Sequence, residues 1–237
     1  MAQTLTEIMQ QNDQRKIIRM QKAGKRFFIK LTQDKFRSYI QALGTRSLRN
    51  RGKMFDFEFQ ESHKNVYNLL YWYINGNQDK FRQLLPDQKV TIEGKEFILQ
   101  SDVMKGICFC GPVGSGKTIL METFLGIFEN EIMEEPFLRI EAQEWGDVIK
   151  KKGKAHFKYR PLNINDLFKE DDVVKDFGST INPAYDTLSL RGETGAWTFA
   201  TSNNKFESFH KRYGEYISSR MLEMFNFIEV PGPNLRK

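Results

Sequence analysis

The chain has 237 residues, of which 40% are hydrophobic and 28% are charged, which suits a globular protein with a sizeable core and favours one full domain with a smaller appendage. No apolar run reaches the ~20 residues that span a bilayer. The polar N-terminus lacks the basic and then apolar order of a secretory signal, so we expect a cytoplasmic protein with no membrane segment.

The positive charge of the chain is concentrated near its N-terminus. The net charge is +6, whereas residues 1–53 contain 13 Lys or Arg and 3 Asp or Glu, so this segment is at about +10 and the remainder at about −4. This asymmetry predicts contact with a polyanion or an acidic protein surface. A solvated basic face on a helical arm is an equal alternative.

Two apolar patterns predict helices in this basic segment. Residues 3–22 place apolar side chains among polar ones at helical spacing. A second apolar set over residues 27–43 ends at Gly44, a residue typical of helix ends. The polar and basic stretch that follows predicts a linker over residues 45–54.

The predicted division of the chain is a basic helical segment with its linker over residues 1–54 and a core over residues 55–237. The core begins with a flanking helix at residues 62–76. The aromatic run Tyr71-Trp72-Tyr73 in this helix has two interpretations, core packing or a base-stacking platform, and its helical spacing favours packing.

Strands and helices alternate from residue 106 onward, which predicts an α/β fold with a five-stranded parallel sheet flanked by helices. The expected strands are residues 107–110, 137–140, 161–167, 197–201 and 227–230. The expected helices are residues 118–128, 144–152, 183–190 and 206–224, the last with a candidate break at Tyr213-Gly214.

Cys108 and Cys110 are the two cysteines of the chain. Alternation along the strand puts both on one face, where a free cysteine packs as a small hydrophobe. The three histidines are scattered and supply no zinc-ligand spacing. We therefore expect both thiols to be buried in the core.

The sequence GPVGSGKT at residues 111–118 fits the phosphate-binding pattern G-x-x-x-x-G-K-[ST] at every fixed position. The glycines let the backbone amides point at a β-phosphate, Lys117 adds positive charge, and the Thr118 hydroxyl can ligate Mg²⁺ at the positive end of the following helix. The loop follows a predicted strand and opens a predicted helix, as this motif requires. The residues expected to bind the nucleotide are Gly111, Pro112, Val113, Gly114, Ser115, Gly116, Lys117, Thr118 and Ile119.

Two other strands supply polar side chains for this loop. The strand at residues 161–167 contains Asp166 near its end. Asp166 is expected to bind Mg²⁺ or activate water, with a helix cap or turn as the alternative. Asn203 follows the strand at residues 197–201 and could orient a water against the γ-phosphate or simply form a turn. Residues 204–207 (NKFE) loosely match the guanine-reading N-K-x-D, but Glu207 replaces the Asp, which disfavours a GTPase.

Several motifs between residues 105 and 236 occur together. They are the phosphate loop, the acidic strand, Asp176-Phe177-Gly178 with Asn182-Pro183, Phe199-Ala200-Thr201-Ser202-Asn203, and Tyr213-Gly214 with Ser219-Arg220-Met221. In these motifs the sequence resembles the DnaC/IstB branch of the AAA+ ATPases, which contains helicase loaders and transposition helper ATPases. The resemblance implies a P-loop AAA+ core, from about residue 105, without a C-terminal helical lid.

The resemblance also implies roles for individual residues. ATP and Mg²⁺ would be the cofactors, and Asn203 would be the polar sensor. Arg220 matches the second arginine of the family pattern Y-G-x-R-I-x-S-R, and Arg236 falls where a C-terminal arginine senses the nucleotide. Both arginines could instead form surface ion pairs. The catalytic residues expected on this basis are Asp166, Asn203 and Arg220.

The chain departs from the family pattern at two positions. Asn165 replaces the first of two adjacent acids, so the amide contributes no charge next to Asp166. Tyr216 replaces the first arginine of Y-G-x-R, which in the family reaches the nucleotide of a neighbouring subunit. Such arginines contribute about 10³-fold or more to the rate in well-studied NTPases. Arg212, one helical turn earlier, is a candidate substitute.

Together these features predict an ATP-dependent loader that places a replicative helicase on DNA. It would bind the helicase and single-stranded DNA, self-associate on ATP or DNA, and hydrolyse ATP slowly or only with a partner. Two alternatives stay open: a transposition helper ATPase of the IstB type, and a non-catalytic adaptor in which ATP only fixes a conformation.

Overall fold

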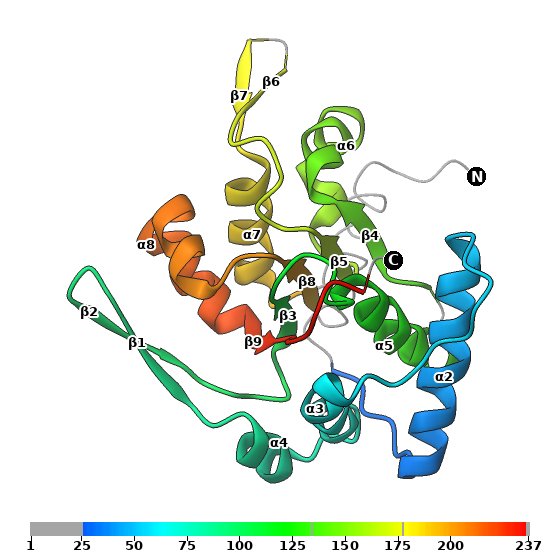
Figure 1. Ribbon diagram of the computed structural model, residues 1–237. Coiled ribbons are helices and arrows are strands. Elements are labelled where there is room, and N and C mark those ends of the chain that lie inside the picture. The colour runs from blue at the N-terminus through cyan, green and yellow to red at the C-terminus, as the bar shows by residue number, and fades with distance from the viewer. Residues whose placement is uncertain (1–25, 134, 177, 236–237) are drawn as a thin grey trace, which may run out of the picture.

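The computed structural model describes residues 26–133, 135–176 and 178–235 of the chain. Its centre is a five-stranded sheet with the strand order β4-β5-β8-β3-β9 (Figure 1), and every neighbouring pair is parallel. The strands are β3 (Gly106–Cys110), β4 (Leu138–Glu141), β5 (Leu162–Asn165), β8 (Thr198–Ser202) and β9 (Phe225–Glu229). The predicted α/β class and five-stranded parallel sheet are therefore confirmed.

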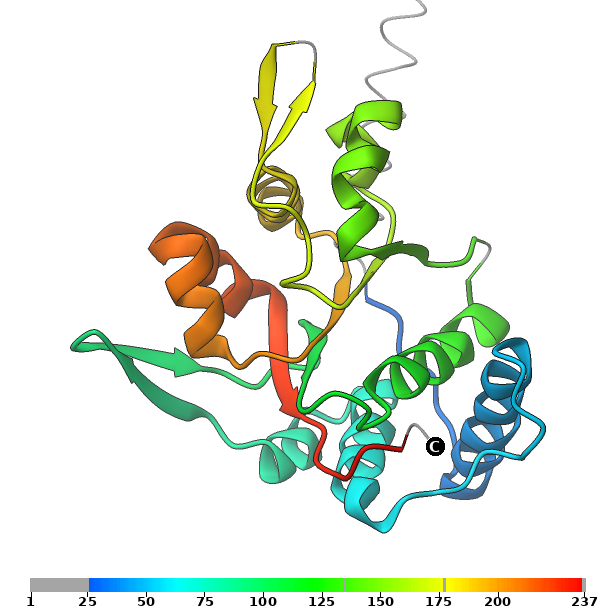
Figure 2. The same cartoon turned by 45° about the horizontal axis from the view of Figure 1, so that its top comes forward.

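Helices cover both faces of this sheet, because its central strands are apolar on both sides. β3, β5 and β8 are buried at every residue, as expected of parallel strands between two helical layers. One layer, which we call the α5 face, consists of α2 (Gln33–Asn50), α3 (Lys64–Ile74) and α5 (Lys117–Glu131). The opposite layer consists of α6 (Trp145–Lys152), α7 (Pro183–Thr194) and α8 (Phe206–Met224) (Figure 2).

α2 is one continuous helix. It begins after Thr32, whose side chain caps the first turn, and it continues past Gly44 to Asn50. The predicted helix end at Gly44 is therefore wrong, and so is most of the predicted linker over residues 45–54. Gly44 serves close packing instead, because a Cβ at this position would lie 2.4 Å from Cγ of Phe57.

The described part of the basic segment belongs to the core. Ile29 lies in an extended stretch before α2, and Phe36 and Ile40 lie on α2; all three are buried in the same apolar cluster as the residues of α5. Residues 26–53 therefore pack against the phosphate-loop core and do not stand apart from it. The helix predicted over residues 3–22 lies outside the described residues.

Three unpredicted elements extend the fold. α4 (Gln78–Leu84) follows α3, and two antiparallel hairpins protrude from the body (Figure 1). These hairpins are β1 (Gln88–Ile92) with β2 (Lys95–Leu99), and β6 (Val174–Asp176) with β7 (Ser179–Ile181). The first turns at Glu93 and Gly94, which both have positive φ, as tight hairpin turns require.

α8 is bent where the sequence predicts a break. Gly214 has φ 76° and ψ 176° within this helix, a combination that only glycine adopts readily. The helix resumes and runs to Met224, and β9 follows without a loop. Among the described residues, the chain after β9 is non-helical through Leu235.

A fully buried arginine, Arg191 of α7, joins the segment before β5 to β8. Its guanidinium donates hydrogen bonds to the carbonyl oxygens of Phe157, Arg160 (3.0 Å) and Trp197 (2.7 Å) and to the hydroxyl of Thr198 (2.8 Å). Burial lowers the pKa of Arg191 to about 9. No carboxylate is among these partners, so the cation is solvated by backbone dipoles.

The packing predictions for the aromatic run and the cysteines are confirmed. Tyr73 is fully buried, and its ring lies against Phe81, Phe124 and Phe199. This ring therefore packs in the core and cannot stack on a base. Cys108 and Cys110 are buried and unbridged, and both lie in the cluster beneath α6, α7 and α8.

Candidate nucleotide-binding site

The phosphate loop lies between β3 and α5 and has the backbone that its motif requires. Gly111, Gly114 and Gly116 have φ angles of 150°, 84° and 89°, a region in which other residues are strained. The amide of Ser115 donates to the carbonyl of Pro112 at 3.3 Å, which closes the turn. The three glycines therefore permit the positive φ angles of the phosphate loop, as the sequence pattern predicted.

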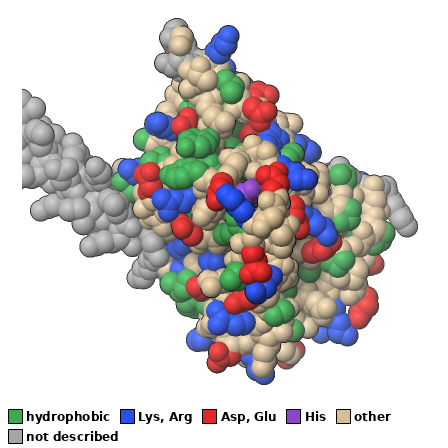
Figure 3. All heavy atoms as spheres, turned by 90° about the vertical axis from the view of Figure 1, so that its left-hand side faces the viewer, with side chains coloured by type: hydrophobic (Ala, Val, Ile, Leu, Met, Phe, Trp, Pro, Cys, Tyr) green, Lys and Arg blue, Asp and Glu red, His purple; other side chains and the backbone are tan. Residues whose placement is uncertain are grey.

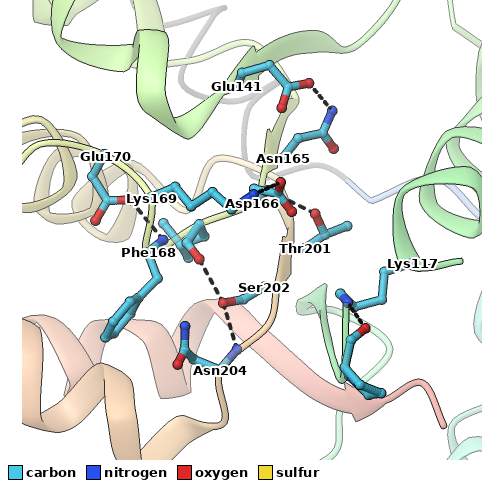
Figure 4. A network of polar contacts seen from close by, with 12 residues as sticks. Lys117, Glu141, Asn165, Asp166, Phe168, Lys169, Glu170, Thr201, Ser202 and Asn204 are labelled. Atoms are coloured by element: carbon cyan, nitrogen blue, oxygen red, sulfur yellow. Dashed lines mark hydrogen bonds and ion pairs between the residues drawn. The ribbon is translucent and has the colours of Figure 1, made fainter. Parts of the chain in front are cut away.

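Lys117 occupies the first position of α5 and is 5% exposed. Its Nζ donates to the carbonyl oxygens of Gly111 (2.9 Å) and Pro112 (2.7 Å) (Figure 4). The ammonium group is thus held over the loop at the positive end of the α5 dipole. A cation together with free N-terminal amides favours an anion such as a phosphate.

Two hydroxyls beside Lys117 are available to a ligand. The Ser115 hydroxyl is fully buried and has no hydrogen-bond partner in the described part of the chain. A buried hydroxyl without a partner costs about 1–3 kcal/mol, a cost that a phosphate oxygen would remove. Thr118 follows Lys117 at the start of α5, where its hydroxyl can face the same ligand. The loop therefore fits the phosphates of a nucleotide.

The C-terminal residues of the described chain lie on the phosphate loop. The amide of Leu235 donates to the carbonyl of Gly114 at 2.9 Å. A Cβ on Gly114 would lie 1.9 Å from Oδ1 of Asn234, so the two segments are in close contact. Arg236, the predicted nucleotide-sensing arginine, follows directly and lies outside the described residues.

His63 is the last residue of a short 3-10 helix, Glu61–His63, which precedes α3, and it contacts this tail. It is 2% exposed, and its Nε2 lies 2.9 Å from the carbonyl oxygen of Pro231. Burial lowers the pKa of His63, and backbone contacts to Pro231 and Ser115 oppose that shift. A neutral imidazole therefore connects the tail to the loop.

Asp166 lies at the end of β5, on the edge of the sheet at which the phosphate loop opens (Figure 4). Its backbone is left-handed, with φ 55°, a region that Asp tolerates better than most residues. Its amide donates to the Thr201 hydroxyl at 3.0 Å, and its carboxylate pairs with Lys169 Nζ at 2.6 Å. The pair with Lys169 occupies Oδ2 of Asp166, and Oδ1 forms no hydrogen bond with the described residues.

Asn165, the departure from the family pattern, is 4% exposed and ends β5. Its Nδ2 donates to Oε1 of Glu141 at 2.9 Å, and its Oδ1 accepts from Nδ2 of Asn163 at 3.1 Å. Glu141 ends the neighbouring strand β4 and is the register partner of Asn165. A carboxylate is therefore present at this edge, one strand away from its expected position.

The end of β8 supplies the contacts that hold this edge together. The Ser202 hydroxyl donates to the carbonyl of Leu167 at 2.7 Å and accepts from the amide of Asn204 at 3.1 Å (Figure 4). Asn203, the predicted sensor, lies in the turn between them. Its side chain is partly buried and forms no hydrogen bond with the described residues. Its position at this edge agrees with the prediction, and its role stays a prediction.

Arg212 is engaged within its own chain. Its guanidinium pairs with Glu170 (3.3 Å) and Asp172 (2.8 Å), and it donates to the carbonyl oxygens of Phe168 and Glu170. It also lies 4.4 Å from the centroid of the Phe168 ring. These contacts hold Phe168 at φ 97°, a strained angle for a bulky residue. Arg212 is therefore engaged within its own chain, and its suggested role as a substitute arginine stays a prediction.

Arg220, predicted to be catalytic, is a half-buried residue of α8 whose side chain packs against Gly192 of α7. It pairs with Glu223 at 2.9 Å and lies 5.6 Å from the centroid of the Tyr216 ring. The Tyr216 hydroxyl lies 3.1 Å from Ser189 Oγ on α7. No contact joins Arg220 to the phosphate loop within the described chain, so its predicted role would have to act across a subunit boundary.

The donors at this edge fit a metal that is shared with phosphate oxygens. Among the described residues, no group of three or more His, Cys, Asp or Glu side chains could hold a metal ion by itself. Mg²⁺ commonly takes one or two protein oxygens, several waters and substrate phosphates. Thr118 and Asp166 supply such oxygens, so Mg²⁺ would be bound only together with the nucleotide.

The sequence did not point to two residues of this site, His63 and Glu141, and it gave Thr201 and Ser202 only as part of a motif. The contacts of all four come from pairing between strands or from segments far apart in the chain. Glu141 had one usable signal, because it is a carboxylate at the end of a predicted strand.

The fold was compared with known proteins. No protein-family model and no curated protein matches the chain. The structure of the DnaC helicase loader is similar with a TM-score of 0.50 and 17% identity, over 74% of this chain and 93% of that chain. DnaI is similar with a TM-score of 0.46 and 23% identity, over 56% of this chain and 73% of that chain. AMPPCP-bound DnaA from Aquifex aeolicus has a TM-score of 0.43 and 14% identity, over 76% of this chain and 50% of that chain. The similarity to the DnaC structure agrees with the predicted α/β fold, in which helices flank a five-stranded parallel sheet.

Proposed function

We propose that this chain, which has the fold of the DnaC helicase loader, binds ATP with Mg²⁺ and helps to place a replicative helicase on single-stranded DNA. The observation that carries the proposal is the phosphate loop. The loop follows the central strand β3 and has the required glycine geometry, a buried Lys117 and a Ser115 hydroxyl that has no hydrogen-bond partner among the described residues. In this proposal the protein acts in the cytoplasm.

The proposal includes slow or partner-dependent ATP hydrolysis. The Asp166 carboxylate is paired with Lys169 through one oxygen. Arg212 is held in its own chain by Glu170 and Asp172, and Tyr216 stands where the family pattern has an arginine. A partner that separates Asp166 from Lys169, or supplies an arginine, would raise the rate.

A basic surface supports the nucleic-acid part of the proposal. Residues 148–165 contain six Lys or Arg, all between residues 150 and 160, and no Asp or Glu. Lys151, Lys152 and Lys154 are exposed at the end of α6 and in the short helix that follows, and they form no ion pair with the described residues. Arg191 anchors this segment through the carbonyls of Phe157 and Arg160. The surface is thus a fixed array of positive charge, which suits a phosphate backbone.

The face that carries α8 and the β1–β2 hairpin differs from this surface. Positive and negative side chains are interspersed on it (Figure 3). Lys89 pairs with Glu96 at 2.9 Å, and Lys95 pairs with Glu215 at 2.6 Å. No helix in the described residues is long and apolar enough to cross a membrane. A nucleic-acid phosphate backbone is the partner we assign to the basic surface.

The test measures binding of a labelled single-stranded oligonucleotide by fluorescence anisotropy, with ATP and Mg²⁺, over a range of salt concentrations. Each phosphate contact contributes about 0.7 to the slope of log affinity against log salt for single strands. Replacing Lys151, Lys152 and Lys154 with Gln should lower that slope by about 2. The matched control replaces Lys80, Lys89 and Lys95 with Gln and removes the same net charge from another face.

Equal slopes for both triple variants would contradict the assigned surface. The helicase part is tested by capturing the replicative helicase of the same genome on the immobilised full chain, with and without ATP. Capture that is absent, or that does not respond to ATP or to Lys117→Ala, would contradict the loader role.

The second candidate function is an adaptor in which ATP fixes a conformation without turnover. It is favoured by Asn165, whose amide is fully engaged with Glu141 and Asn163, and by the engagement of Arg212. Steady-state ATPase assays with and without single-stranded DNA separate the two candidates. Turnover above that of Lys117→Ala would exclude the adaptor.

A further inference from the structure

The end of β5 lacks a carboxylate at Asn165, and the neighbouring strand supplies one at the same level. Glu141 is the register partner of Asn165 in the parallel β4–β5 pair. Side chains at the same level of neighbouring parallel strands point to the same face. Asn165 and Glu141 therefore lie on one face of the sheet, and their side chains are joined at 2.9 Å.

That face is the α5 face, from which the phosphate loop opens. Arg139, two residues before Glu141 on β4 and hence on the same face, pairs with Glu129 of α5 at 2.7 Å. Asn163, two residues before Asn165, is fully buried on that side of β5. Glu141 thus lies on the side of the sheet where Lys117 and Thr118 begin α5. It also lies at the edge where the strands end.

The carboxylate of Glu141 fixes how the two amides are oriented. A carboxylate only accepts hydrogen bonds, so the amide nitrogen of Asn165 must face it. Oδ1 of Asn165 must then face Asn163, which has to present its own amide nitrogen at 3.1 Å. The chain of donors runs from Asn163 through Asn165 to Glu141, and all three members are polar. Asn163 Oδ1 ends this chain without a partner in the described residues.

Glu141 keeps one oxygen available. Oε1 accepts from Asn165, while Oε2 has no hydrogen bond or ion pair within the described chain, and the residue is exposed. A structural anchor for Asn165 alone would require only the first oxygen. The negative charge therefore remains at this edge and is displaced by one strand, a spacing of about 4.8 Å.

We infer that Glu141 is a positioning residue for Mg²⁺ bound with a nucleotide. It orients the Asn165 amide, and its own carboxylate on β4 supplies the negative charge that β5 lacks at residue 165. The inference rests on the proposed function, since it concerns the same nucleotide site. Mg²⁺, when bound, would neutralise phosphate charge. Glu141 orients the Asn165 amide and balances the cation, while Thr118 and Asp166 keep the roles described above.

A charge exchange between the two positions tests the inference. Glu141→Gln removes the carboxylate, and the double variant Glu141→Gln with Asn165→Asp moves it to β5. Binding of a fluorescent ATP analogue is measured against Mg²⁺ concentration and without metal, and bound Mn²⁺ is measured by electron paramagnetic resonance. Glu144→Gln, an exposed glutamate three residues along the chain, is the matched control.

Glu141→Gln should raise the Mg²⁺ concentration for half-maximal binding by at least about tenfold, as loss of residues behind metal ligands generally does. Metal-free nucleotide affinity and the thermal midpoint should match those of Glu144→Gln. The double variant should return to within about threefold of the native Mg²⁺ requirement. Bound Mn²⁺ should follow the same order.

Three results would overturn the inference. They are an Mg²⁺ requirement for Glu141→Gln equal to that of Glu144→Gln, an equal loss of metal-free binding, or a defect that Asn165→Asp does not repair. Failure of the proposed function looks different, because the native chain itself would then bind no nucleotide with or without metal.

Discussion

The phosphate loop and the end of β5 lie on the same edge of one sheet, yet they are specified in different ways. The loop is complete in one run of residues, and its glycines, Lys117 and Ser115 are all placed by local backbone geometry. The end of β5 is assembled from three strands. The Thr201 hydroxyl of β8 accepts from the amide of Asp166, and the Glu141 carboxylate of β4 accepts from the side chain of Asn165. The geometry of the phosphate loop is therefore local, whereas the polar contacts at the end of β5 depend on the register of three strands.

Substitution of Arg191, which holds the segment before β5, should have the largest effect, a loss of stability. Arg191→Leu leaves the carbonyls of Phe157, Arg160 and Trp197 buried without their donor, so the free energy of unfolding should fall by about 3 kcal/mol or more. Urea denaturation measures this change. Arg46→Leu, at an exposed position on α2, is the control and should change stability by less than about 1 kcal/mol. Equal midpoints for the two variants would contradict the structural role of Arg191.

The next effect contrasts the two regions directly. Lys117→Ala removes the buried ammonium from the loop and should weaken ATP binding about 100-fold, or about 2.7 kcal/mol. Lys169→Ala removes the partner of Asp166 and should change ATP affinity less than about threefold. Titration calorimetry measures both. Similar losses in the two variants would show that β5 contributes as much to nucleotide binding as the loop does.

Gly114→Ala tests whether the loop depends on its backbone and on the tail. Its φ of 84° and the 1.9 Å approach to Asn234 predict a loss of stability of about 1–3 kcal/mol. The double variant Gly114→Ala with Asn234→Gly removes the steric overlap but not the strained φ. Thermal unfolding of both variants should show partial recovery in the double variant. Full recovery would mean that the tail contact alone accounts for the loss.

His63 should give the smallest effect, and it depends on pH. Burial lowers the pKa of His63 in the folded chain below its value of about 6.5 in the unfolded chain. The unfolded state therefore binds more protons below pH 6.5, and the folded state loses stability as the pH falls through that value. The free energy of unfolding, measured from pH 7.5 to 5, should fall more steeply with decreasing pH for the native chain than for His63→Gln. Parallel curves would contradict a lowered pKa of His63 in the folded chain.

Much of the fold could be predicted because apolar runs and turn residues are local signals. All five strands of the sheet and the break in α8 at Gly214 follow from such signals. The end predicted at Gly44 was wrong because that glycine accommodates Phe57, a partner 13 residues later. Glycine thus marks a break within α8 at Gly214 and close packing within α2 at Gly44.

The candidate site could be predicted in part for the same reason. The phosphate loop is one contiguous motif, so its residues can be predicted as a unit. Glu141 acquires its position from pairing with Asn165, 24 residues along the chain, and Arg212 acquires its partners from Glu170, 42 residues away. Contacts of this kind depend on the register of the assembled sheet, which a single sequence does not display.

The contact of the tail with the phosphate loop has a consequence for synthesis on the ribosome. β3 has β8 and β9 as its two neighbours, and Gly114 is held by Leu235. A nascent chain that has released residues 111–118 therefore still lacks both neighbours of the preceding strand and the segment that lies on the loop. Nucleotide affinity should thus arise late in translation, after most of the sheet has emerged, so that stalled chains arrested before residue 225 would bind ATP poorly.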